Sequence, residues 1–270
     1  MKLKRFLGAP ALLVAFLFLA NSCHRPATTA ATNPTTAPTA NSAGTPIAPL
    51  QSPSGKTYAR LHTPKSDNLE PVTIPPVPAG AAPNVDSFNG TARKAAKLSI
   101  ASGTPQSFSD LGDVLDSLIP DTQMRAKNIS KTATSGRIAP EEQRVVTVTA
   151  FLYASSKESD NDFHCIVGRD PSKPARYMNV EVSALPPSSS QFFAALRAAR
   201  NEYKAFFTAN GNGLPTSGYD KYNPPIPIKL TGSLFFDVDH VPPAVGPTGM
   251  KPLSAWEIHP VSDIQFEQQQ

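Results

Sequence analysis

The 270-residue sequence is poor in cysteine, with Cys23 and Cys165 alone, and it has a single tryptophan. A framework of several disulfide bonds is therefore excluded, and a folded domain must be held together by its apolar core, which a domain of this size can supply. The apolar run from Leu12 to Ala20 is too short to span a bilayer, because a transmembrane helix needs about 20 such residues.

The sequence also lacks the short motifs that mark common enzyme sites. It has no G-x-S-x-G nucleophile elbow, no P-loop and no G-x-G-x-x-G dinucleotide loop. His164 directly precedes Cys165, so on a strand their side chains point to opposite faces and cannot form a nucleophile–base pair. We interpret Cys165 as a small buried apolar residue and assign no catalytic residue.

The N-terminus has the pattern of an export signal. Three positive charges in the first five residues precede the apolar run, and small residues stand three and one positions before Cys23. Residues 1–22 are therefore predicted to be a signal peptide. The sequence around Cys23 resembles, in part, the lipobox of bacterial lipoproteins, which predicts lipidation of Cys23, membrane contact through the lipid and an extracytoplasmic place in the cell envelope. Simple secretion, or a soluble periplasmic protein, is the alternative.

Two further segments precede the C-terminal domain. Residues 23–90 are rich in Pro, Thr and Ala, a composition that predicts a disordered tether. Residues 91–140 are poorly defined apart from one short helix. That helix is predicted from a cap at Ser109 or Asp110 and a stop at Pro120, with an apolar stripe formed by Leu111, Val114, Leu115 and Leu118.

Residues 141–270 predict a compact, mainly β domain. β-branched and aromatic runs predict strands at 144–154, 162–168, 177–182, 226–237 and 255–266. A long helix stands between the third and fourth strands, beginning at a capping box of Ser188 and Gln191. Three strands, a helix and two strands are the order of the OB-fold, a five-stranded Greek-key barrel. A small α+β sheet is the alternative.

The net charge of +4 is unevenly distributed along the chain. Residues 141–270 carry 11 Lys and Arg against 14 Asp and Glu, so the predicted domain is acidic. OB-folds that bind nucleic acid present a basic groove with aromatic stacking residues. Tyr153, Tyr177 and Phe235 are candidates for an aromatic binding face, but the charge argues against nucleic acid and favours an envelope protein or polymer as partner.

Histidine and carboxylate residues recur near the predicted strand ends. His164, Asp237, His240 and His259 are candidate ligands of a divalent metal, because imidazole and carboxylate are ordinary zinc ligands. Their spacing matches no compact metal motif, so hydrogen-bonding roles at strand ends are the alternative and no cofactor is assigned. On the last strand, Trp256 and Ile258 are predicted to face the core, while Glu257 and His259 point away from it.

The same segments carry a family resemblance. The strand Gly232-Ser233-Leu234-Phe235-Phe236-Asp237-Val238-Asp239-His240, with Asp162-Phe163-His164 before it and Trp256-Glu257-Ile258-His259-Pro260-Val261 after it, resembles an uncharacterised family of small bacterial exported proteins. Asn161 stands where that family tends to have glycine. The resemblance implies an OB-like domain and says little about function. Three functions remain in view: a non-enzymatic binding module, a metal-dependent hydrolase using the His/Asp cluster, and a nucleic-acid-binding OB domain.

Overall fold

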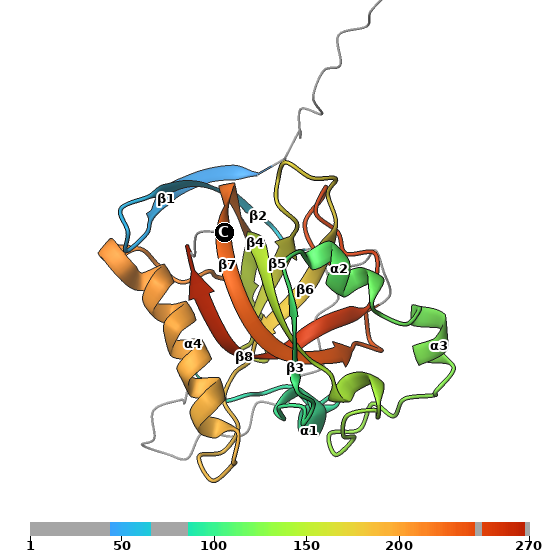
Figure 1. Ribbon diagram of the computed structural model, residues 1–270. Coiled ribbons are helices and arrows are strands. Elements are labelled where there is room, and N and C mark those ends of the chain that lie inside the picture. The colour runs from blue at the N-terminus through green and yellow to red at the C-terminus, as the bar shows by residue number, and fades with distance from the viewer. Residues whose placement is uncertain (1–43, 66–85, 241–244, 268–270) are drawn as a thin grey trace, which may run out of the picture. The chain divides into compact units, whose positions relative to one another are not determined.

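The computed structural model describes residues 44–65, 86–240 and 245–267, which form a mainly β structure with one long helix (Figure 1). This agrees with the predicted class. The predicted signal peptide, Cys23 and much of the predicted tether lie outside the described residues. The strands are β1 (Thr45–Gln51), β2 (Thr57–Thr63), β3 (Pro105–Phe108), β4 (Val145–Lys157), β5 (Phe163–Gly168), β6 (Tyr177–Val182), β7 (Tyr219–Phe236) and β8 (Trp256–Phe266). The helices are α1 (Lys94–Lys97), α2 (Leu111–Asp116), α3 (Asp121–Arg125) and α4 (Phe193–Thr208), with 3-10 turns at Glu141–Gln143 and Ala209–Gly211.

The strands form one mixed sheet in the order β1-β2-β7-β8-β6-β5-β4-β3, and β7 also pairs with β4. Parallel pairing occurs between β3 and β4 and between β6 and β8, and the remaining pairs are antiparallel. The prediction of five strands is therefore corrected to eight. Because β7 pairs with both β8 and β4, the strands β4, β5, β6, β8 and β7 follow one another around a closed ring of pairings.

The core follows from the alternation of side chains along the strands. On β6, Met178, Val180 and Val182 are buried in the main apolar cluster, as their spacing predicts. Helix α4 lies at one side of the sheet, beside β8 (Figure 1), and its buried face includes Leu196 and Tyr203. The predicted capping box is wrong: α4 begins after Phe192 without a side-chain cap, and Ser188 lies outside it.

Helix α2 confirms the short helix predicted between residues 91 and 140. The side chain of Asp110 accepts a hydrogen bond of 2.6 Å from the backbone N–H of Gly112, and Leu111 and Val114 are buried. The rest of this segment is better defined than its composition indicates. It contributes α1, α3 and the edge strand β3, which lies parallel to β4.

The predicted tether needs correction between residues 44 and 65. This part forms the antiparallel hairpin β1–β2, and β2 continues the sheet by pairing with the first residues of β7. Leu50 and Tyr58 are buried in the main core. Composition alone missed the hairpin because β2 is held in the sheet by pairing with β7, which lies more than 150 residues further along the chain.

A second layer covers the other face of strands β7 and β8. Residues 86–101, called the covering segment below, include α1 and place Arg93 and Lys97 over the ring of Phe235, at 4.6 and 5.8 Å from its centroid. Arg93 also donates two hydrogen bonds to Glu142, of 2.8 and 2.6 Å, and both side chains are buried. Arg137 donates to the backbone oxygens of Leu234 and His259. Polar side chains on this face of the sheet are consequently enclosed.

Candidate functional site

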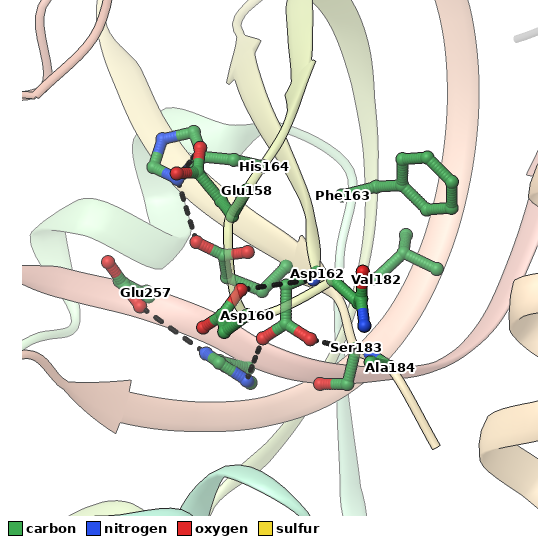
Figure 2. Close-up of polar contacts among 12 residues, drawn as sticks. Glu158, Asp160, Asp162, Phe163, His164, Val182, Ser183, Ala184 and Glu257 are labelled. Atoms are coloured by element: carbon green, nitrogen blue, oxygen red, sulfur yellow. Dashed lines mark hydrogen bonds and ion pairs between the residues drawn. The ribbon is translucent and has the colours of Figure 1, made fainter. Parts of the chain in front are cut away.

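A group of buried polar side chains lies between the sheet and the segments that cover it. They come from β5, β6 and β8, at positions that alternate with the core residues, and from the residues flanking β5 and β7. We call this group the polar layer: Asp162, His164, Asn179, Glu181, Asp237, Glu257 and His259. Every member is no more than 7% exposed. Figure 2 shows His164, Asp162 and Glu257 directed into this interior.

The four histidine and aspartate residues predicted from the sequence belong to one connected network, but they do not converge on one point. His164 Nδ1 lies 2.7 Å from Glu181 Oε1 on the neighbouring strand. His240 pairs with Asp237 through its Nδ1. His259 has Nε2 3.4 Å from Asp162 Oδ2 and Nδ1 3.6 Å from Glu257 Oε2 (Figure 2).

Glu181 and Glu257 connect these pairs, and the sequence did not single them out. Donor atoms of Glu181, Glu257 and His259 all lie within 4.8 Å of one another, and so do those of Asp237, His240 and Glu257. Glu257 belongs to both groups. The alternation of side chains along the strands could have identified them. Because positions 178, 180, 182, 256 and 258 face the core, Glu181, Glu257 and His259 lie together on the opposite face.

Several atoms of the polar layer lack a hydrogen-bond partner among the described residues. They include Glu181 Oε2, Asn179 Oδ1, Asp162 Oδ2 and both ring nitrogens of His259. Other atoms of the layer are hydrogen-bonded. Asn179 Nδ2 donates to Glu257 Oε1 at 3.0 Å. The backbone N–H of Ala184 donates to Asp162 Oδ1, as Figure 2 shows. Buried polar atoms without partners are costly, so this arrangement points to a function or a bound group.

The environment shifts the acidities of the layer in different directions. Burial, together with nearby Asp237 and Glu181, raises the pKa of Glu257 to about 8. Burial and the charge of Asp160 raise the pKa of Asp162. Burial opposes ionisation of Asp237 as well, but the hydrogen bond with His240 outweighs it and lowers the Asp237 pKa. Burial, then Lys97 and Arg137, lower the pKa of His259, so this imidazole is neutral at pH 7.

The three aromatic residues predicted to form a binding face are divided by the structure. Tyr153 and Tyr177 are half-buried and contact each other edge to face, with ring centroids 5.1 Å apart. Phe235 is corrected: it is 1% exposed, enclosed by Arg93, Lys97 and the ring of His259 at 5.3 Å, and unavailable to a partner. Cys165 is buried in the core as predicted, and burial raises its thiol pKa.

A pocket lies where β2 and β4 end, next to the polar layer, since its lining residue Glu158 has Oε1 3.8 Å from Nδ1 of His164. It has a volume of about 720 Å³. Asn161, in the turn between β4 and β5, adopts a left-handed φ of 77°, which asparagine and glycine tolerate best. The lining combines polar side chains with apolar surface and consists of His62, Pro64, Lys65, Lys157, Glu158, Ser159, Asn161, Ser217 and Gly218. A smaller pocket of about 270 Å³ lies between Tyr177 and Leu253.

Comparisons with protein-family models, with curated proteins and with solved structures found no match for this chain. The family resemblance of residues 144–266 therefore stays a prediction. Among the helices in the described ranges, none combines the length and apolar character that crossing a membrane requires.

Proposed function

We propose that this chain is an exported, lipid-anchored and non-enzymatic binding protein, whose β domain binds a polymer of the cell envelope. The observation that carries the proposal is the 720 Å³ pocket, whose lining offers hydroxyl, amide and ammonium groups, while the histidines and carboxylates of the polar layer are buried behind it. Pockets of about 300–1,000 Å³ are the usual size of ligand sites. Anchoring at Cys23 is part of the proposal and is supported by the leader sequence.

The finer fold in this proposal is an OB-like barrel with three added strands. The ring of pairings β4-β5-β6-β8-β7 and the position of α4 between β6 and β7 support it, because the OB-fold has five strands with this helix placement. The added strands are β1, β2 and β3. OB-folds bind extended polymers on a strand face and adjoining loops, which suits an envelope polymer.

The chemistry of the pocket favours a polyhydroxylated or anionic polymer such as a glycan. Ser159, Asn161 and Ser217 offer hydroxyl and amide groups. Lys157 adds a cation whose pKa is lowered by burial and by Arg200 nearby. Lys65, the other cation of the lining, is ion-paired with Glu158. The acidic balance of residues 141–270 disfavours the alternative of nucleic-acid binding.

Co-sedimentation of the purified full-length chain with isolated cell-wall polymer tests the binding proposal. We expect Ser217→Trp, which fills the pocket, and Lys157→Ala to reduce binding at least about tenfold, since a charged hydrogen bond contributes about 1.5–3 kcal/mol. Lys229→Ala is the matched control, because Lys229 is exposed on β7 outside the pocket. Equal binding by all four proteins would remove the pocket from the proposal.

The metal-dependent hydrolase is the second candidate, favoured by the connection of His164, Asp237, His240 and His259 through two glutamates. Burial weighs against it, because a substrate needs access to the reacting groups. Hydrolysis of ester, phosphate or glycan substrates by the metal-loaded chain, lost in His259→Ala, would replace the binding proposal with this one.

A further inference from the structure

We propose that Glu181, Glu257 and His259 form a binding site for a divalent transition-metal cation of the zinc type, which ties strand β6 to strand β8. The three residues offer one imidazole nitrogen and two carboxylate oxygens, all within 4.8 Å of one another. Imidazole and carboxylate are established zinc ligands, whereas calcium and magnesium take oxygen ligands throughout. The inference is independent of the ligand of the large pocket.

Unpartnered atoms carry the inference beyond a cluster of acids. Glu181 Oε2 and both ring nitrogens of His259 have no hydrogen-bond partner within the part of the chain that the structure describes. His259 is 1% exposed, so water cannot readily satisfy its nitrogens. A cation at this point would accept the lone pairs that the protein leaves unused.

Both glutamate ligands are also oriented by a second residue. His164 holds Glu181 Oε1 at 2.7 Å, and Asn179 holds Glu257 Oε1 at 3.0 Å, so each glutamate keeps its other oxygen for the centre. Asp162 Oδ2 lies 3.4 Å from Nε2 of His259 without hydrogen-bond geometry, and Nδ1 lies 3.6 Å from Glu257 Oε2. Metal sites in proteins characteristically have such outer partners, and a carboxylate behind the ligating histidine is common among them.

The charge balance of the layer favours the same conclusion. Five carboxyl groups lie in the interior, and each of these residues is at most 7% exposed: Asp160, Asp162, Glu181, Asp237 and Glu257. From the covering segment, Lys97 brings one positive charge close to Asp162 and Glu257. A divalent cation among these groups would favour their ionised forms, which burial alone disfavours.

The other possible group, Asp237, His240 and Glu257, is the weaker site. Asp237 and His240 already bind each other, and Asp237 accepts a further hydrogen bond from the backbone N–H of Asp239. The side chain of His240 is 15% exposed, so this group is less enclosed than Glu181, Glu257 and His259.

The position of the site gives it a structural role. The pairing of β6 with β8 comprises two residue pairs, Asn179 with Glu257 and Val180 with Ile258, and is the shortest in the ring. Glu181 comes from β6, while Glu257 and His259 come from β8. A cation between them would cross-link the ring where backbone hydrogen bonding is most limited.

Metal titration of the chelator-treated full-length chain tests this site. We expect one Zn²⁺ per chain by elemental analysis and a melting temperature that rises with added Zn²⁺, with Ca²⁺ having no effect at the same concentration. Glu181→Gln and Glu257→Gln should abolish the rise while folding without metal, because each removes a carboxylate ligand and keeps the shape of the side chain. Asn179→Ala should weaken zinc binding about 10–100-fold.

Two controls separate this site from its competitors. His62→Ala, at a histidine paired with Asp220 outside the layer, and His240→Gln should both retain the zinc response. Zinc binding that survives Glu181→Gln but not His240→Gln would place the metal at Asp237 and overturn the proposal, as would absence of stoichiometric zinc. If the glutamate variants do not fold, X-ray absorption of the zinc-loaded wild type decides. Nitrogen and oxygen ligands alone support the site, and a sulfur ligand refutes it.

Discussion

Trp256 fixes the start of β8 in two ways. Its ring is 1% exposed and packs against Phe236 with centroids 5.4 Å apart, and its indole nitrogen donates a 2.9 Å hydrogen bond to the backbone oxygen of Ile119. The apolar ring and its polar N–H are thus both satisfied, which is the condition for burying tryptophan. The side chain links the sheet to the segment between α2 and α3.

Trp256→Ala should lower the free energy of unfolding by about 3–5 kcal/mol, because it leaves a cavity and an unpaired carbonyl. That is a large share of the roughly 5–15 kcal/mol that stabilises a typical domain. Urea unfolding followed by circular dichroism measures the change. Leu253→Ala is the control, since Leu253 is 84% exposed, and it should differ from wild type by less than about 0.5 kcal/mol. Similar losses in both variants would contradict the packing of β8.

For single residues, the sequence predicted which face of the sheet a side chain points to, but not whether that face is buried. The alternation along 256–259 correctly places Trp256 and Ile258 in the core and turns Glu257 and His259 to the other face. It gives no sign that the other face is closed. That closure comes from the covering segment and from Arg137, which are distant in sequence and have no regular hydrophobic period.

Asp110 gives helix α2 both its cap and its ion pairs. Its carboxylate accepts from the N–H of Gly112 and pairs with Arg169 at 2.8 Å and Lys173 at 2.5 Å. Burial acts to raise the pKa of Asp110, but these hydrogen bonds outweigh it and lower the pKa below its ordinary value. The short helix is therefore held at its first turn by charges from the loop between β5 and β6.

Asp110→Asn keeps the cap and removes the charge, so it should cost about 1–2 kcal/mol at pH 7. Because the folded-state pKa is depressed, the stabilisation is present above the unfolded pKa of about 3.9 and is lost as the pH falls through the folded value. The difference between wild type and variant should therefore shrink between pH 5 and pH 3 in urea titrations. Asp113→Asn, exposed on the same helix, controls for the loss of one charge. A difference independent of pH would contradict the ion pairs.

The hairpin β1–β2 is expected to contribute to the stability of the domain. Deleting residues 44–65 should cost about 3–6 kcal/mol, because burial of a large apolar side chain contributes about 1.5–3 kcal/mol and the hairpin buries Leu50 and Tyr58. It would also leave the start of β7 without its partner β2. Thermal unfolding measures the loss, and deletion of residues 24–43, which the sequence predicts to be tether, is the control. Equal melting temperatures would show that the hairpin only rests on the sheet.

A helix or strand could be predicted from the sequence where a periodic pattern in its own residues determines its structure. β5, β6 and β8 and the apolar face of α4 were predicted, because their residues alternate or repeat with the helical period. β1 and β2 were missed, since Pro, Thr and Ala in that stretch carry no such pattern. The start of α4 was misplaced because Ser188 forms a suitable capping sequence, while the chain turns into the helix only after Phe192.

For the whole molecule, the first experiment on location concerns Cys23. Cys23→Ser should release the chain from membranes into the soluble extracytoplasmic fraction, since two acyl chains are needed for stable anchoring. Immunoblots of fractionated cells measure this. Cys165→Ser is the control, because Cys165 is buried in the domain and should leave the location unchanged. A wild-type chain already free of the membrane would leave secretion as the explanation.

The closure of the strand ring has a consequence for the order of folding. β4 lies beside β7, with Val145 opposite Ser233, so the closed ring of strands forms only after the last third of the chain is available. Before that point β4, β5 and β6 can pair as a three-stranded sheet, but their apolar face has neither β7 nor α4 to cover it. Such long-range pairings form late in folding. A chain without its C-terminal strands therefore exposes an incomplete sheet that is prone to aggregation. If the chain is exported as proposed, a core that its own C-terminal strands complete would keep it unfolded until the whole chain has crossed the membrane.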